Sequence, residues 1–264
     1  MPAVAGEWYR GVYPGVLVTL PALAGAAAVL SLGALLQSAA GFGFGLFAVP
    51  ALLVIGFSLP QAVMLCVAGS AMQKVLAVYA LREHVPWRNL KPLIVSGLVT
   101  LPAGLWLMQR LSRAGRDTTG IVVAALIMAM LLLRRLAAPR GRAVVPAAWG
   151  VAAGAVSGVL NGLANIGGPP VVLWSLAHDW SNRRLRVTTL AQSLVFVPFQ
   201  VGVMILLFGR GVIVALGWGM LLSPLVILAT RAGLRLGGRI PLPWLRLGME
   251  LLLILMAVSA ARPF

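Results

Sequence analysis

A glycine-rich stretch and a second stretch rich in glycine and proline interrupt long apolar runs, and amide side chains lie beside both. The first, residues 37–45, reads QSAAGFGFG, and the second, residues 161–170, reads NGLANIGGPP. Glycine weakens a helix through its backbone freedom and proline removes an amide donor, so each stretch predicts a broken helix. A helix that restarts after a break presents unpaired N–H groups and the positive end of its dipole, which attract anions. The stretches therefore predict an anion site, with close helix packing through small residues as the alternative.

A lysine lies deep in another apolar run. Lys74 follows Ser70 and Gln73 at helical spacing, so the three side chains form one polar stripe. A charge inside an apolar segment is costly and usually faces a cavity or a partner. Lys74 is about seven residues, roughly 10 Å, from the end of its segment, so snorkelling to the interface is the alternative. We expect Lys74 to coordinate an anion.

The predicted substrate-binding residues belong to the two interruptions and to this polar stripe with its counterpart in the second half. They are Gln37, Gly41, Gly43, Gly45, Ser70, Gln73, Lys74, Asn161, Asn165, Gly167, Gly168, Pro169 and Ser193. Glu250 is a candidate for coupling transport to protons, because it is the one carboxylate clearly inside an apolar segment. Arg246 precedes it by four residues, and a plain ion pair on one helix face is the favoured interpretation.

Hydrolytic, metal and nucleic-acid functions are poorly supported. One cysteine, two histidines and five acidic residues leave little material for a catalytic triad or a metal site. The formal net charge of +16 is carried by basic residues in short gaps between apolar runs, where a membrane protein places them. We therefore expect neither an enzyme nor a nucleic-acid-binding protein, and no cofactor or metal.

The composition is that of an integral membrane protein. Hydrophobic residues make up 61% of the 264 residues and charged residues 10%, against about 45–50% and about 25% in soluble domains. We expect an all-α, multi-pass protein of the cell (inner) membrane, with the lipid bilayer as its main partner and homo-oligomerisation left open. The apolar segments are 16–39, 44–57, 59–81, 90–111, 119–137, 147–164, 169–178, 186–209, 212–231 and 243–262.

The two halves of the chain resemble each other. Matching positions recur at an offset near 123: Ala40 with Ala164, Gly43 with Gly167, Ser70 with Ser193, and Pro102 with Pro224. Each half, residues 1–137 and 138–264, has about five helical segments, of which the second is short and predicts a broken or re-entrant helix. If the second half is inverted, 14 of the 21 basic residues fall on the cytoplasmic side, which favours inverted repeats.

The segment from Ala164 to Val172 (ANIGGPPVV) and the stretch from Gly41 to Pro50 (GFGFGLFAVP) resemble the glycine-rich signatures of the TauE/SafE sulfite exporter family. The turn at 85–88 (VPWR), the chain length and the duplicated halves are also similar to that family. The resemblance implies a secondary transporter that exports small anions such as sulfite or organosulfonates. An uptake permease or channel for a carboxylate or a metal ion, and a non-transporting membrane subunit, remain alternatives.

Overall fold

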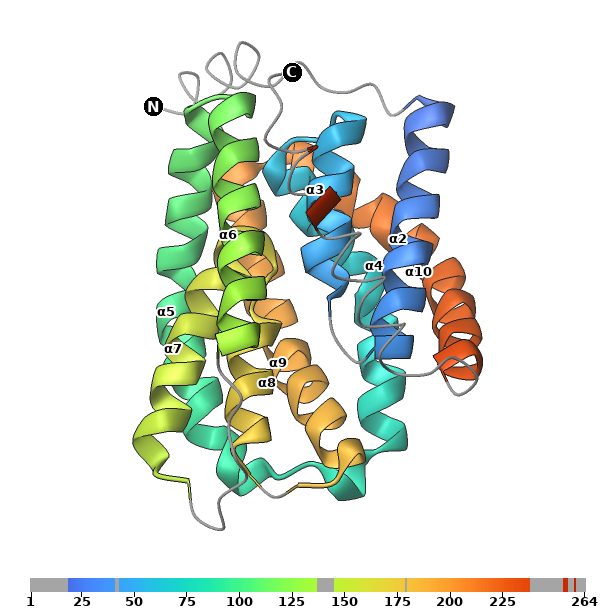
Figure 1. The fold of residues 1–264 in the computed structure, drawn as a ribbon. Helices are drawn as coiled ribbons and strands as arrows, with labels where there is room; N and C mark the ends of the chain where they lie inside the picture. Colours follow the sequence, from blue (N-terminus) through green and yellow to red (C-terminus); the bar gives the residue numbers. More distant parts are fainter. Residues whose placement is uncertain are drawn as a thin grey trace.

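The computed structural model describes residues 19–40, 43–136, 145–178 and 180–237, together with residues 254, 255 and 259. Within these residues the regular elements are all helical (Figure 1). The α-helices are α2 (Leu20–Ala40), α3 (Phe44–Ile55), α4 (Leu59–Ala80), α5 (Trp87–Arg113), α6 (Arg116–Leu136), α7 (Ala147–Ala164), α8 (Gly168–Leu176), α9 (Asn182–Phe208) and α10 (Arg210–Gly237). A 3-10 turn, η1 (Arg82–His84), follows α4. Most of the predicted segment 243–262 lies outside the described residues.

Six of these helices are long and apolar enough to cross a membrane: α2, α4, α5, α7, α9 and α10. For the described residues, these helices confirm the prediction of a helical protein with several segments able to span a membrane. Helices α3 and α8 have 12 and 9 residues. At 1.5 Å per residue they are about 18 and 14 Å long, well short of the roughly 30 Å hydrocarbon core.

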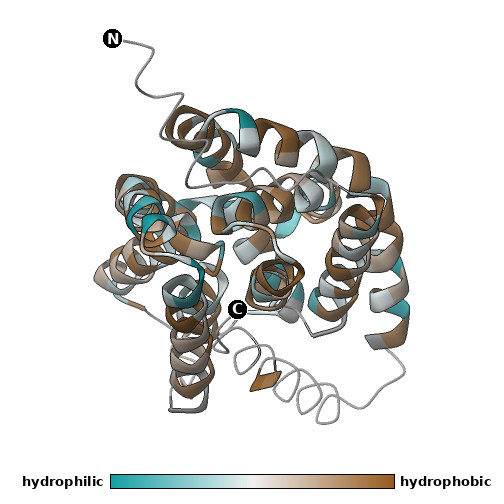
Figure 2. Cartoon of the chain, turned by 90° about the horizontal axis from the view of Figure 1, so that it is seen from above, coloured by the Kyte–Doolittle hydropathy of each residue, from teal (hydrophilic) through white to brown (hydrophobic). Residues whose placement is uncertain are grey.

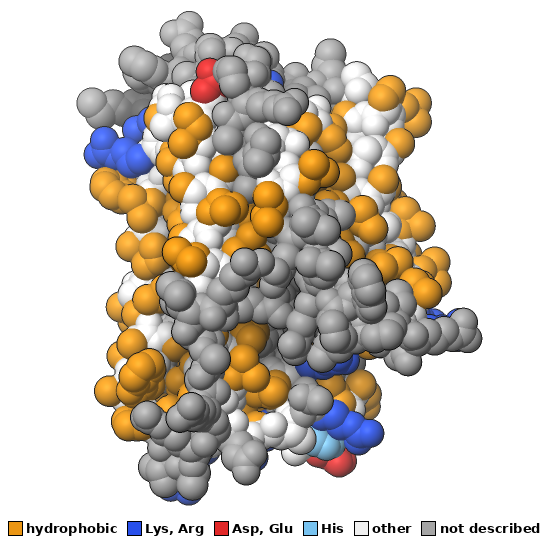
Figure 3. Space-filling model, in the orientation of Figure 1, with side chains coloured by type: hydrophobic (Ala, Val, Ile, Leu, Met, Phe, Trp, Pro, Cys, Tyr) orange, Lys and Arg blue, Asp and Glu red, His pale blue; other side chains and the backbone are white. Residues whose placement is uncertain are grey.

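The outer surface of the bundle is hydrophobic. Leu206 is 84% exposed and Val99 is 73% exposed, and many other large apolar side chains are exposed as well. A continuous apolar surface of this kind would be unfavourable in water. Hydrophobic residues recur along the helices in Figure 2, and hydrophobic side chains cover most of the described part of the face in Figure 3. Lys and Arg side chains gather mainly toward the upper and lower parts of that face. The surface fits a lipid environment over the middle of the bundle.

Two helical hairpins enter the bundle from opposite ends. In Figure 1, α2 runs downward from the upper end and α3 returns upward, whereas α7 rises from the lower end and α8 returns downward. The helices of each pair contact each other. The start of α3 and the end of α7 therefore lie inside the bundle, at the two interruptions that the sequence indicates.

Helices α5 and α7 form the most extensive helix–helix contact, and glycines allow their backbones to approach. A methyl group at Gly154 would overlap the Leu93 carbonyl, and one at Gly158 would overlap the Gly97 carbonyl. Thr100 Oγ1 donates a hydrogen bond of 2.8 Å to the Ala155 carbonyl across the contact. This contact fixes the position of α7, whose end forms one side of the candidate site.

The substitution Gly158→Ala should lower the thermal stability of the detergent-solubilised protein. Overpacking at such a contact costs about 1–3 kcal/mol. Gly202→Ala is the matched control, because nothing lies within 4 Å of the added methyl group and alanine favours a helix over glycine by about 1 kcal/mol. We expect an unchanged or slightly raised Tm for the control, and equal Tm values for the two variants would contradict the packing account.

Candidate functional site

The two helix interruptions contact each other in the interior of the bundle. Helix α3 begins after Gly43, whose φ of 105° is a left-handed conformation that favours glycine. Helix α7 ends at Ala164, and Asn165 follows with a φ of 55°. A methyl group at Gly45, in the first turn of α3, would overlap the backbone carbonyl of Asn165. Gly45 therefore allows the start of α3 to pack directly on the end of α7.

The α7 break has a well-defined cap. The Asn165 amide donates to the Asn161 carbonyl at 2.9 Å, and the Ile166 amide donates to the Leu160 carbonyl at 3.2 Å. This pattern with a left-handed residue is a common helix C-terminus, and asparagine is the residue after glycine that adopts it most readily. Helix α8 then begins at Gly168, with proline in its first turn as the sequence predicts.

A cavity of about 50 Å³ lies where the interruptions meet. Residues of α2, α3, α4, α7, α8 and α9 and of both breaks line it, so segments from both halves of the chain contribute. Nine of its lining residues are among the predicted binding residues: Gln37, Gly43, Gly45, Lys74, Asn161, Asn165, Gly168, Pro169 and Ser193. The other four are Phe44, Leu46, Ile166 and Thr189.

Four other predicted residues are not placed at this cavity. Ser70, Gln73 and Gly167 do not line it. Ser70 Oγ instead donates to the Cys66 carbonyl at 2.6 Å, which satisfies the hydroxyl within its own helix. Gly41 lies outside the described residues, as does the candidate coupling residue Glu250.

Lys74 supplies the one ammonium group of the cavity lining. Its side chain is only 7% exposed, and it forms no ion pair with another residue of the described part of the chain. No acidic residue is among the lining residues. A buried cation of this kind is costly unless an anion or hydrogen-bond acceptors compensate it. The cavity is therefore electropositive and suited to a small anion.

The two helix starts contribute to this positive field unequally. The first amides of α3, those of Phe44, Gly45 and Leu46, have no acceptor within their own helix. In α8, Gly168 has such an amide but Pro169 and Pro170 have none. We infer that α3 supplies most of the backbone donors, whereas α8 contributes mainly its dipole and the Gly168 amide.

A ladder of amide and hydroxyl groups holds the α7 break against α9. Asn161 Nδ2 donates to Gln200 Oε1 at 3.2 Å, and Gln200 Nε2 donates back to the Asn161 carbonyl at 3.1 Å. Gln192 Nε2 donates to Ser157 Oγ at 2.9 Å, and Ser157 Oγ donates to the Gly167 carbonyl at 2.6 Å. Fully satisfied buried networks of this kind make a structure rigid.

The predicted site includes Asn161 but leaves out the other members of this ladder, Ser157, Gln192 and Gln200, although the sequence contains a signal for them. Ser157 and Asn161 are four residues apart on α7, and Gln192 and Gln200 are eight apart on α9, so each pair lies on one helix face. Their pairing depends on how the two helices pack, which a single sequence does not specify. Thr189 is also missing from the predicted residues, although it lines the cavity.

An aromatic cluster lies at the end of α8, and none of its residues lines the cavity. The His178 ring stacks on Trp180 with 4.1 Å between centroids, and Trp174 contacts both rings edge-on. His178 Nδ1 lies 3.0 Å from the Trp174 carbonyl, and the Arg184 guanidinium lies 4.6 Å from the Trp180 ring centroid. The cluster joins the end of α8 to the start of α9.

The cluster should make stability depend on pH. Partial burial lowers the pKa of His178, and the positive charge of Arg184 lowers it further, against the opposing effect of the hydrogen bond to Trp174. The unfolded chain, with a histidine pKa of about 6.5, then binds more protons than the folded protein, so stability falls as the pH drops below that value. We expect a steeper fall in Tm between pH 7.5 and 5.5 for the wild type than for His178→Gln. Parallel curves would contradict this role of His178.

Comparisons with known proteins identify one family. The profile of the Sulfite exporter TauE/SafE family matches residues 25–260, which is most of the chain. No curated protein and no solved structure matches the chain.

Proposed function

Because the chain belongs to the TauE/SafE sulfite exporter family, we propose that it is a secondary transporter that exports small sulfur-containing anions such as sulfite or organosulfonates. The observation that carries this proposal is the position of Lys74, a buried ammonium without a carboxylate partner in the described residues, at the cavity where two helix breaks meet. An anion would compensate the charge and accept hydrogen bonds from the start of α3.

The cavity lining discriminates against cations. A transition-metal ion is normally bound by carboxylate, imidazole or thiolate ligands, and none of these groups is among the lining residues. Lys74 would also repel it. The positive charge of Lys74 and the helix starts would attract a small carboxylate as well. The choice of sulfur anions over carboxylates therefore rests on the membership of the TauE/SafE family.

The size of the cavity favours the smaller substrates. At about 50 Å³ it is about one third of an engineered cavity of roughly 150 Å³ that holds benzene. We therefore propose sulfite, or an inorganic anion of similar size, as the substrate that fits the described conformation. A longer organosulfonate would require the bundle to open.

Alternating access is the mechanism that we propose for movement past this site. Residues 1–137 and 138–264 would form two inverted repeats, and the opposite directions of the α2–α3 and α7–α8 hairpins support this arrangement (Figure 1). Rocking of one hairpin against the other would expose the cavity first to one side and then to the other. The membrane potential, negative inside, drives an exported anion outward.

We place the protein in the inner membrane with the lower end of Figure 1 toward the cytoplasm. Basic residues of the α4–α5 connection and of the starts of α5 and α9 lie at this end: Arg82, Arg88, Lys91, Arg183, Arg184 and Arg186. Such an excess of Lys and Arg is typical of cytoplasmic loops.

The substitution Lys74→Met should lower sulfite flux without lowering the stability of the protein. Sulfite flux into or out of liposomes should fall at least tenfold, because a hydrogen bond to a charged group contributes about 1.5–3 kcal/mol. The Tm without anion should stay equal or rise, because an uncompensated buried charge is removed. The matched control is Lys91→Met, since Lys91 is the only other lysine and is exposed. Retained flux in Lys74→Met, or equal losses in both variants, would contradict the proposed site.

The substitution Asn165→Gly separates folding from binding at the α7 break. Glycine adopts the left-handed conformation of residue 165 readily, so the cap and the fold should persist. The side-chain amide is lost, and we expect weaker stabilisation of the purified protein by sulfite, measured as the shift in Tm with anion concentration. An undiminished shift would show that the Asn165 side chain does not contact the anion.

A further inference from the structure

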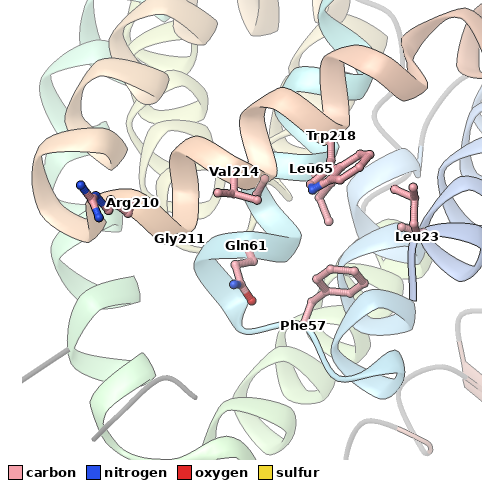
Figure 4. Close-up of a pocket in the computed structure, with 10 residues that line it drawn as sticks. Leu23, Phe57, Gln61, Leu65, Arg210, Gly211, Val214 and Trp218 are labelled. Atoms are coloured by element: carbon pink, nitrogen blue, oxygen red, sulfur yellow. The ribbon is translucent and has the colours of Figure 1, made fainter. Parts of the chain in front are cut away.

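A second and larger cavity lies on the other side of α4, at the upper end of the bundle (Figure 4). Its volume is about 210 Å³, and residues of α2, α4, α10 and the α3–α4 turn line it. Leu65 of this cavity and Lys74 of the anion site are nine residues apart on α4, which places them about 180° apart around the helix. The second cavity is therefore separate from the proposed transport site.

Helix packing explains why this space exists. Helices α4 and α10 touch closely near Gly219, where a methyl group would press on the Ala68 side chain. Helices α2 and α10 touch near Gly233, where a methyl group would overlap the Leu35 carbonyl and the Ser38 hydroxyl. The cavity is lined by α10 residues that precede both contacts, between Arg210 and Trp218. The three helices thus diverge beyond their glycine contacts, toward the upper end.

The cavity carries a charged group at one end and is mostly apolar toward the other. In Figure 4, Arg210 lies at one end, Gln61 lies near the middle, and Leu23, Phe57 and Trp218 lie toward the other end. Arg210 is exposed and forms no ion pair with a residue of the described ranges. Arg210 and Trp218 are eight residues apart on α10, or about 12 Å along its axis.

We propose that this cavity binds an anionic phospholipid, with the headgroup phosphate at Arg210 and part of one acyl chain against the apolar wall. Arg210 begins α10, so its guanidinium lies at a helix end, where the headgroups of a bilayer are found. Basic pockets between transmembrane helices are suited to anionic headgroups. An apolar cavity of roughly 150 Å³ holds benzene, so 210 Å³ has room for several methylene groups.

A lipid-competition experiment tests this proposal. The purified protein is reconstituted in nanodiscs with equal amounts of phosphatidylglycerol and phosphatidylcholine, and the lipid that stays bound after mild extraction is quantified by mass spectrometry. We expect an approximately fivefold preference for phosphatidylglycerol, which is what one arginine near an anionic surface supplies. Arg210→Gln should reduce this preference to about one.

Two further variants test whether the lipid preference depends on this cavity. Arg113→Gln is the matched control, because Arg113 is an exposed arginine that ends α5 at the same end of the bundle and does not line the cavity. It should keep the preference. Ala215→Leu fills the apolar part of the cavity and should lower the retention of both lipids.

Three outcomes would overturn the proposal. The preference could persist in Arg210→Gln, or fall equally in Arg113→Gln, which would indicate only general surface charge. Arg210→Gln could also leave lipid retention unchanged and alter the oligomeric state, which would identify the cavity as a contact between copies of the chain. None of these outcomes bears on sulfite transport, which is measured separately.

Discussion

A peptide backbone that breaks its helix inside a membrane must find other partners for its amides and carbonyls. This constraint permits irregular backbone at that depth only where protein buries it or where it lines a cavity. Here the two breaks are in contact, because Gly45 allows the start of α3 to lie on the backbone of Asn165. The Ser157 hydroxyl accepts from Gln192 and donates to the Gly167 carbonyl, which satisfies part of the second break. The remaining free donors are those of the helix starts, and they are available to a ligand.

The charge distribution follows from the same constraint. Lys74 adds a positive charge where two helix starts already make the field positive, and no carboxylate lines the cavity to offset it. This arrangement is costly without an anion, and the gain when an anion enters is correspondingly large. The Asn161–Gln200 pair and the glycine contact of α5 with α7 hold the α7 break in place. Lys74, by contrast, lines the cavity without an ion-pair partner among the described residues.

Much of the site could be predicted from its glycines, its prolines and its buried lysine. Each of these residues affects the backbone or the charge at its own position, so its effect is visible in the local sequence. Gly43 and Asn165 adopt the left-handed conformations that a break requires, and Pro169 begins α8. Ser70 was grouped with Lys74 by helical spacing, but its hydroxyl bonds to the Cys66 carbonyl, since a serine in an apolar helix readily satisfies itself within one turn. The ladder between α7 and α9 and the cavity beside Arg210 depend on how distant helices pack and diverge. That information is spread over many contacts and has no local pattern in the sequence.

In the proposed mechanism, one anion binds between the two helix breaks. The most direct measurement is an experimental structure with selenite, whose selenium gives an anomalous X-ray signal that locates the anion without reference to the chain. The account predicts a single strong peak within hydrogen-bonding reach of Lys74 Nζ and the first amides of α3, with Asn165 and Gly168 on its other side. A peak elsewhere in the bundle, or breaks that lie far apart with apolar side chains between them, would contradict it.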